Sequence, residues 1–363
     1  MGAVNAGTGD FSGRLNLPIY TTGNYPAGNE GDMIYDTTAG SIFIFNGDAW
    51  VPPGFGRKPT ATGGDRVENI GGFMHHFFYS AGTLNVTGGG DAYCYVIGGG
   101  GGGSGGGANS GGAGGAGGGL VYAKFAMTTG TITMSVGTGG LGGQANSGSS
   151  TAAGDGGQSQ FSHGGYTFTA TGGLGAPATS GGGPFSGRSG GTGNINGSQS
   201  YVYDGQTATY GQGGTGGSGG TSTSNAGTAP AGSNGAPGAG GGSTNNGTPA
   251  NGGSGNAGFF TGGGGGGARD GDGGNGTIGQ GGSGYYNGGR GSNPSQYQGE
   301  NGGSPNSNAT GGNRGNLGSR RWNAGGGGGF AGGGGGAAGD ASNSPNASGG
   351  QGGGGLIVIK YQA

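Results

Sequence analysis

Short runs in which apolar and polar residues alternate occur in two parts of the chain, and this alternation predicts β-strands. In the first part, three such runs lie at residues 33–35, 41–45 and 49–51. They are separated by Thr37-Thr38-Ala39-Gly40 and by Asn46-Gly47, whose residue types favour tight turns between strands. We therefore predict that residues 1–58 contain a small three-stranded β meander.

Similar runs recur from about residue 73. They lie at residues 73–79, 83–86, 93–97, 120–127, 131–136 and 166–171. In the run from Ile132 to Val136, alternate side chains share one face, as in a half-buried antiparallel strand. Residues 356–361 are apolar on both faces and directly follow four glycines, which predicts a central strand closing the same sheet. We expect an antiparallel β framework from residues 60–171 and 356–363.

Glycine dominates the rest of the chain, with 119 of the 363 residues. Collagen is excluded, because it needs glycine at every third position and abundant proline, whereas this chain has 13 prolines and uninterrupted glycine runs such as 262–267. Ordering a glycine costs more backbone entropy than ordering any other residue. An ordered state therefore depends on hydrogen bonds between main-chain groups.

Residues 172–355 have almost no aliphatic side chains, and glycine runs recur throughout them. A polyglycine II helix has three residues per turn and rises about 3.1 Å per residue, so a six-residue run spans roughly 19 Å. Such helices lack internal hydrogen bonds and need neighbours beside them. We predict a layer of packed polyglycine II helices over residues 172–355, joined by variable loops; a flexible Gly/Ser coil is the alternative.

The charge pattern argues against binding to nucleic acid. The formal net charge is −2 and the 12 Lys and Arg residues are scattered singly, so no basic stripe for nucleic acid is present. No apolar stretch reaches 18 residues, so we expect no membrane insertion, and no export signal is recognisable at the start of the sequence. The single cysteine, Cys94, excludes an intrachain disulfide framework and is expected to be buried.

Two junctions between strand and glycine are the most specific features of the sequence. Tyr95-Val96-Ile97 runs into Gly98–Gly103, and Gly352–Gly355 runs into Leu356–Tyr361. Over about residues 73–363 the chain thereby resembles the glycine-rich domain of bacteriophage tail-fibre and tail-tip proteins. Residues 31–50 are also similar to a module common in fibre proteins.

This resemblance implies a virion protein that acts outside the cell, as a tail-fibre or tip adhesin, and that is released by lysis. It implies two kinds of partner, a protein or glycan of the host cell surface and other tail-fibre or baseplate proteins. A homotrimer is among the assemblies that it implies. Residues 1–58 depart from the N-terminal segment of the tip adhesins of T-even-like phages, so the fibre attachment of that family does not carry over to this chain. We expect residues 1–58 to be an N-terminal β attachment module that joins the chain to a virion fibre or a neighbouring protein.

Residues with catalytic or metal-binding potential are few. His75 and His76 are adjacent in a predicted strand and so point to opposite faces, and His163 has no acidic or cysteine neighbour in sequence. The acidic turn Asp270–Asn275 lacks the downstream glutamate of a calcium loop. No Ser-His-Asp arrangement is recognisable among the many serines. We therefore expect no enzymatic activity, no metal and no cofactor.

Aromatic and arginine residues between the glycine runs are the candidates for receptor binding. Tyr and Trp offer large contact areas with few torsions, and arginine binds acidic groups. The candidates are Phe185, Tyr201, Tyr203, Phe259, Phe260, Tyr285, Tyr286, Trp322, Arg290, Arg320 and Arg321. The alternative for each aromatic ring is that it plugs the end of the glycine layer or belongs to a small satellite core.

Two other function classes fit the same composition. A purely structural fibre, capsid-decoration or self-assembling filament protein would bury the aromatic rings at subunit contacts. An antifreeze-type ice binder would use a flat glycine-helix face, but the regular short repeat expected for it is not evident. Loops on a rigid scaffold are a common location of binding function, so we favour the adhesin.

Overall fold

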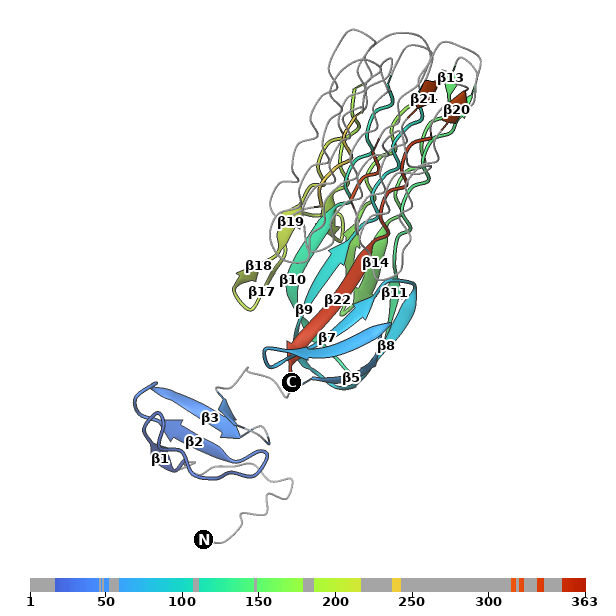
Figure 1. Cartoon of the computed structure of the whole chain (residues 1–363). Helices are drawn as coiled ribbons and strands as arrows, with labels where there is room; N and C mark the ends of the chain where they lie inside the picture. Colours follow the sequence, from blue (N-terminus) through green and yellow to red (C-terminus); the bar gives the residue numbers. More distant parts are fainter. Residues whose placement is uncertain are drawn as a thin grey trace. The chain divides into compact units, whose positions relative to one another are not determined.

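The computed structural model describes residues 17–45, 47, 49–51, 59–106, 111–146, 149–178, 186–216, 237–242, 315–317, 320–322, 332–335 and 348–363. These residues contain strands and no helix, and all strand pairs but one are antiparallel, which confirms the predicted mainly β fold. The chain divides into two compact units, Met1–Lys58 and Pro59–Ala363 (Figure 1).

The N-terminal unit is a four-stranded sheet. Its strands, in spatial order, are β1 (Ile19–Tyr20), β2 (Met33–Asp36), β3 (Ser41–Phe45) and β4 (Trp50–Val51). The last three correspond to the predicted meander, with Gly40 in its first turn at a φ of 64°, which favours glycine. Strand β1, parallel to β2, was not predicted, because two residues are too few to show an alternating pattern.

Asp36, at the end of β2, fixes the turn into β3. Its side chain is fully buried and accepts hydrogen bonds from the backbone amides of Thr38 (2.7 Å) and Ala39 (2.8 Å), from the Thr22 hydroxyl (2.7 Å) and from the Tyr25 hydroxyl. Burial alone would raise the pKa of Asp36, but these four hydrogen bonds lower it to about 2.

The larger unit is built on two six-stranded sheets. The strands of the first sheet, in spatial order, are β19 (Thr209–Gly211), β10 (Leu120–Met127), β9 (Gly90–Ile97), β22 (Leu356–Gln362), β7 (Phe73–Phe78) and β6 (Arg66–Ile70). Those of the second are β16 (Gly193–Ile195), β15 (Tyr166–Ala170), β14 (Ser159–His163), β11 (Gly130–Ser135), β8 (Gly82–Gly88) and β5 (Thr60–Gly63). Strand β22 is central, as predicted for residues 356–361.

The described residues of this unit also form three short hairpins. They are β12 (Ala145–Asn146) with β13 (Ser149–Ser150), β17 (Val202–Tyr203) with β18 (Gln206–Thr207), and β20 (Gly315–Leu317) with β21 (Arg320–Trp322). Asp204 and Gly205 both have positive φ between β17 and β18, which is the two-residue turn that matches the twist of paired strands.

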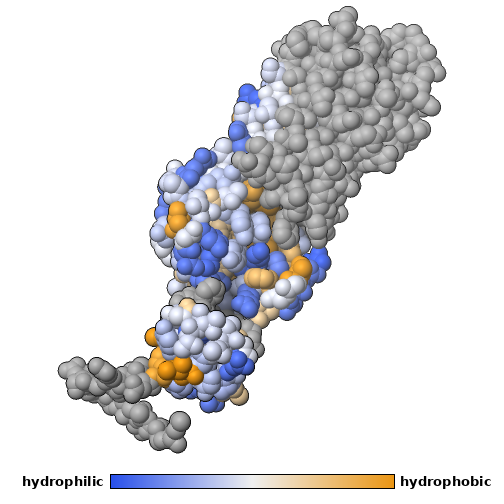
Figure 2. Space-filling view, turned by 90° about the vertical axis from the view of Figure 1, so that its left-hand side faces the viewer, coloured by the Kyte–Doolittle hydropathy of each residue, from blue (hydrophilic) through white to orange (hydrophobic). Residues whose placement is uncertain are grey.

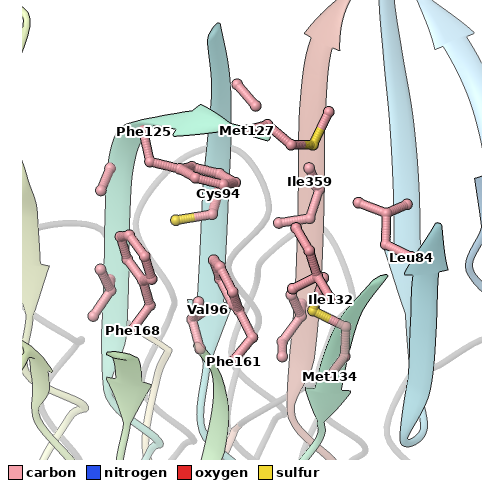
Figure 3. Packing of buried hydrophobic residues seen from close by; sticks show 14 of the residues in the cluster. Leu84, Cys94, Val96, Phe125, Met127, Ile132, Met134, Phe161, Phe168 and Ile359 are labelled. Atoms are coloured by element: carbon pink, nitrogen blue, oxygen red, sulfur yellow. The ribbon is translucent and has the colours of Figure 1, made fainter. Parts of the chain in front are cut away.

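The two sheets form a sandwich with one hydrophobic core between them. Alternate side chains of β9, β10 and β22 point from one sheet, among them Cys94, Val96 and Ile359 (Figure 3). They meet side chains of the other sheet, including Phe161 and Phe168, whose rings stack 4.6 Å apart. This packing follows directly from the two-residue period of the strands.

The framework extends beyond the boundary predicted at residue 171. Strands β16 and β19 add one edge to each sheet, although both lie in the region assigned from sequence to the glycine layer. Ile195, Tyr201 and Ala208 from this region are buried in the sandwich core. Polar residues and glycines surround each of these apolar residues in sequence, so the strand pattern is short and weak.

Extended glycine-rich segments leave one end of the sandwich and run side by side (Figure 1). We call them together the glycine bundle. They comprise residues 98–106, 111–119, 137–143, 152–157, 171–178, 186–192, 212–216, 237–242, 332–335 and 348–355. None of these segments belongs to a β-sheet, and their backbone amides donate to carbonyl groups of other segments in the bundle.

Hydrogen bonding in the bundle has a period of three residues, clearest in the segment 98–104. Amides at 98, 101 and 104 donate to segment 111–119; amides at 99 and 102 donate to segment 152–157; amides at 100 and 103 donate to segment 348–355. Carbonyls of the same segment accept from segments 137–143, 171–178 and 332–335. Segment 98–104 is therefore surrounded by six others and is buried along its whole length.

Only glycine fits most positions of this central segment. A Cβ atom on Gly101 would lie 2.3 Å from the carbonyl oxygen of Leu174 and 2.5 Å from its carbonyl carbon. Outer segments have one open side and carry a side chain at every third residue, with glycine or alanine at most positions between. Examples exposed to solvent are Thr138, Leu141 and Gln144 in one segment and Ala152, Asp155 and Gln158 in the next.

Replacing Gly101 by alanine should lower the stability of the larger unit. The added methyl group meets backbone atoms that cannot rotate away, and overpacking of this kind costs about 1–3 kcal/mol or more. Thermal unfolding followed by circular dichroism should show a lower Tm for Gly101→Ala and an unchanged Tm for Leu141→Ala, which is 69% exposed. An equal Tm for Gly101→Ala and the wild type would contradict the packing described for the central segment.

The N-terminal unit should lose stability in acid because of Asp36. Its folded-state pKa of about 2 lies below the unfolded value of about 3.9, so its contribution is present above pH 4 and lost as pH falls through about 2. Fluorescence of Trp50, measured in a Trp322→Phe background, should report this loss. Asp36→Asn should be less stable at pH 7 and should show a weaker pH dependence between pH 4 and 2.

Candidate functional site

The end of the bundle farthest from the sandwich is where the glycine segments turn back. Strand β9 leads into segment 98–106, and segment 111–119 returns antiparallel to it into β10. The same outward and returning course connects β11 to β14 and β15 to β16. The described outward segments therefore end, and the described returning segments begin, at the end of the larger unit opposite the sheets (Figure 1).

The crossing from β19 to β22 is the longest in the chain, spanning residues 212–355. Segment 237–242 hydrogen-bonds to 111–119, and segment 332–335 bonds to 98–104, so this crossing passes along the bundle more than once. Gly335 accepts a hydrogen bond from Gly350, which places the last outward and last returning segments side by side. Most of the predicted receptor-binding residues belong to this crossing.

Arg320, Arg321 and Trp322 form the backbone of β21. They pair with Leu317, Asn316 and Gly315 of β20, respectively. Figure 1 shows the β20–β21 hairpin at the end of the bundle far from the sandwich, near β13. Three of the predicted residues thus belong to a hairpin at the turning end of the bundle.

Several predicted residues lie outside the described part of the chain. They are Phe185, Phe259, Phe260, Tyr285, Tyr286 and Arg290. The acidic turn Asp270–Asn275 also lies outside it.

Tyr201 is a core residue, so its assignment to a receptor-binding loop is corrected. Its side chain is 6% exposed, and its ring contacts those of Phe168 and Tyr166 edge-on, with centroids 5.7 and 5.0 Å away. Burial raises the pKa of Tyr201 to about 12. The satellite-core alternative was the closer description, except that the ring joins the main core.

Tyr203 also lies at the sandwich and not at the turning end of the bundle. Its hydroxyl donates to the carboxylate of Asp91 at 3.0 Å, and the Nζ atom of Lys124 lies 5.7 Å from its ring centroid. The β17–β18 turn next to it supplies Asp204, whose carboxylate also pairs with Lys124. Tyr203 is therefore part of an ionic cluster at the edge of the sheet.

Lys124 is the centre of that cluster. Its side chain is 6% exposed, and its Nζ atom lies 2.9 Å from a carboxylate oxygen of Asp91. Burial disfavours the charged ammonium, but hydrogen bonds to Asp204 and Asp91 outweigh it and raise the pKa of Lys124. No local pattern in the sequence indicates this cluster, because its members come from three strand regions far apart in the chain.

The histidines are separated as predicted. His76 points into the core, where its Nε2 atom lies 2.9 Å from the Tyr361 hydroxyl, whereas His75 lies on the opposite face of β7 and stacks on Phe77. His163 accepts a hydrogen bond from the Thr128 amide at 2.9 Å. Within the described ranges, no three His, Cys, Asp or Glu side chains gather as a metal site would require.

Cys94 is fully buried in the core, as expected. Burial raises the pKa of its thiol well above the usual value, so the reactive thiolate is disfavoured. Among the residues that the structure describes, no helix is long and apolar enough to span a bilayer.

Comparison with known proteins adds no family to this description. No protein-family model and no curated protein matches the chain.

Proposed function

We propose that this chain is a bacteriophage tail-fibre or tail-tip adhesin that binds a protein or glycan of the host surface. The observation that carries the proposal is the arrangement of the larger unit, in which a hydrogen-bonded glycine bundle extends from the β-sandwich and has the β20–β21 hairpin at its far end. Loops on a rigid scaffold are a common location of recognition sites. In this proposal the protein catalyses no reaction and acts as part of the virion.

The glycine bundle is proposed to be a set of packed polyglycine II helices. The three-residue period of donation in segment 98–104 supports this, since such a helix has three residues per turn and no internal hydrogen bonds. Close approach of backbones at Gly101 supports it as well. Side chains at every third residue of the outer segments fit the same geometry, in which one row of positions faces solvent.

Recognition is assigned to the turning end of the bundle. Trp322, Arg320 and Arg321 lie in the β20–β21 hairpin at that end, and Tyr285 and Tyr286 belong to the same long crossing. Tryptophan, tyrosine and arginine are enriched among the residues that contribute most to binding energy at protein interfaces. Tyr201 and Tyr203 are not included, because both are tied to the sandwich.

The N-terminal unit is proposed to attach the chain to a neighbouring fibre or baseplate protein. One face of its sheet carries a row of exposed apolar side chains, and Figure 2 shows hydrophobic residues grouped on the surface of this unit. Strand register places Ile19, Tyr35 and Ile42 on this face, with exposures of 68%, 37% and 38%. Apolar patches of this kind commonly mark protein–protein contacts.

Binding to candidate host cells tests the proposal. We expect the full-length protein to bind susceptible cells, and Arg320→Ala/Arg321→Ala/Trp322→Ala to reduce that affinity by about tenfold or more, since hot-spot residues each contribute 2 kcal/mol or more. Affinity is measured by flow cytometry with labelled protein. Leu141→Ala, on the side of the bundle, is the matched control and should bind as the wild type does.

Two outcomes would reject the adhesin. The first is absence of binding to every host whose phage carries the chain. The second is binding that the triple variant leaves unchanged while its Tm also stays unchanged. Filaments seen by electron microscopy in place of cell binding would favour the structural-fibre alternative.

A further inference from the structure

The outer face of the first sheet carries a group of aromatic rings around one lysine. This face points away from the sandwich core, because it presents the side chains that alternate with the core residues of β9, β10 and β22. We call the group the Lys360 platform. It consists of Lys360 with Phe73, Tyr93, Tyr95 and Tyr122, all intermediate in exposure.

Strand register brings these residues together from four strands. Lys360 on β22 lies directly opposite Tyr93 on β9, and Tyr95 lies opposite Tyr122 on β10. The Tyr93 and Tyr122 rings are nearly parallel, with an interplanar angle of 9° and centroids 6.0 Å apart. Tyr95 and Tyr122 stack with centroids 4.5 Å apart. Neighbouring strands thus hold three tyrosine rings that stack on one another and are each partly exposed.

Lys360 provides positive charge beside these rings. Its Nζ atom lies 5.1 Å from the centroid of Tyr93, 5.3 Å from that of Phe73, 5.8 Å from that of Tyr95 and 6.0 Å from that of Tyr122. These are distances at which a cation is attracted to an aromatic ring face. The ammonium is therefore held among four rings by weak, non-directional interactions.

No carboxylate within the described residues forms a salt bridge with Lys360. Burial lowers the pKa of Lys360, which means that the surroundings disfavour its charge. Lys124, on the same face, differs in having carboxylates of both Asp91 and Asp204 as partners. An anion placed beside Lys360 would supply the counter-charge that the described residues do not.

Hydrogen-bonding groups border the platform. Lys124 lies directly opposite Tyr93 in the β9–β10 register, so the ionic cluster adjoins the tyrosine rings. The Asp204 side chain is 59% exposed and keeps acceptor capacity for hydroxyl groups of a ligand, and the Asp91 side chain is 24% exposed. One surface therefore combines partly exposed aromatic rings, a cation and carboxylate acceptors.

We infer that the Lys360 platform is a binding site for an acidic saccharide. The carboxylate of a uronic-acid unit would pair with Lys360, the apolar C–H face of a sugar ring would stack on Tyr93 or Tyr122, and ring hydroxyls would donate to Asp204. A saccharide fits better than an acidic peptide, because flat aromatic faces and carboxylate acceptors match C–H faces and hydroxyls. This site lies on the sandwich and is separate from the recognition proposed for the bundle end.

Calorimetric titration of the full-length protein with trigalacturonic acid tests the inference. The matched ligand is its methyl ester, which keeps the sugar rings and removes the charge. We expect the acid to bind and the ester to bind at least about tenfold more weakly, since a charge-assisted pair is lost. Lys360→Met, which retains the apolar stem, should weaken binding of the acid to the same extent and leave Tm unchanged or higher.

Two further variants separate binding from folding. Tyr122→Ala should weaken binding of both the acid and the ester, because it removes one of the stacked rings. Arg188→Met, which removes an exposed cation on the side of the bundle, should leave both affinities unchanged. Thermal unfolding of each variant identifies any loss of affinity that results from misfolding. Tyr122→Phe keeps the aromatic ring and removes the hydroxyl, so its affinity shows the contribution of the ring alone.

The inference is overturned if Lys360→Met binds the acid as the wild type does, or if acid and ester bind equally. It is also overturned if a triglutamate peptide binds as tightly as the trisaccharide in a Lys360-dependent manner. The Arg320/Arg321/Trp322 variant should keep its affinity for trigalacturonic acid. Failure of this site and failure of the proposed adhesin are therefore distinguishable.

Discussion

Hydrogen bonds between the backbones of neighbouring glycine segments are the constraint on which the larger unit depends. Segment 98–104 is glycine except for Ser104, so it has no apolar side chain with which to form a core, and it is buried along its whole length. Buried main-chain groups need partners, and six surrounding segments provide them. These hydrogen bonds bring neighbouring backbones closer together than a Cβ atom would permit. The high glycine content of the segments is therefore a requirement of their backbone hydrogen bonding.

The sandwich reduces the conformational entropy that is lost when the glycine segments of the bundle become ordered. Ordering many glycines costs free energy, but each of the crossings from β9 to β10, β11 to β14 and β15 to β16 starts and ends in a strand that the hydrophobic core already fixes. Closing a loop between fixed ends costs less than ordering a free chain. The hydrophobic core of the sandwich thus fixes where each glycine segment begins relative to its neighbours. Backbone hydrogen bonds then maintain this alignment along the bundle.

Much of the framework could be predicted from sequence, because it depends on local patterns. Strands over residues 120–127 and 356–361 alternate or are uniformly apolar over enough residues to be recognised. Residues 193–211 were missed because Ile195, Tyr201 and Ala208 enter the core singly, among polar neighbours. The three-residue pattern of the outer segments was overlooked for another reason: it is visible only once exposed positions are separated from the many buried glycines.

The candidate sites depend still more on tertiary contacts. Lys360 and its four rings come from four separate strands, and only the order of strands in the sheet brings them together. The ionic cluster at Lys124 likewise needs the β17–β18 turn to reach β10. No spacing between residues in the sequence predicts these contacts between side chains of different strands. By contrast, the opposite orientations of His75 and His76 follow from their adjacency in one strand.

The three-residue period also determines how such a protein changes length during evolution. In the proposed polyglycine II geometry, removing or adding one residue in a glycine segment would turn every later amide toward the wrong neighbour, whereas a change of three residues would restore every direction and alter the segment length by about 9.3 Å. In the gene this step corresponds to nine base pairs. An insertion or deletion in a glycine segment would therefore preserve the hydrogen bonding described here mainly when it adds or removes whole turns.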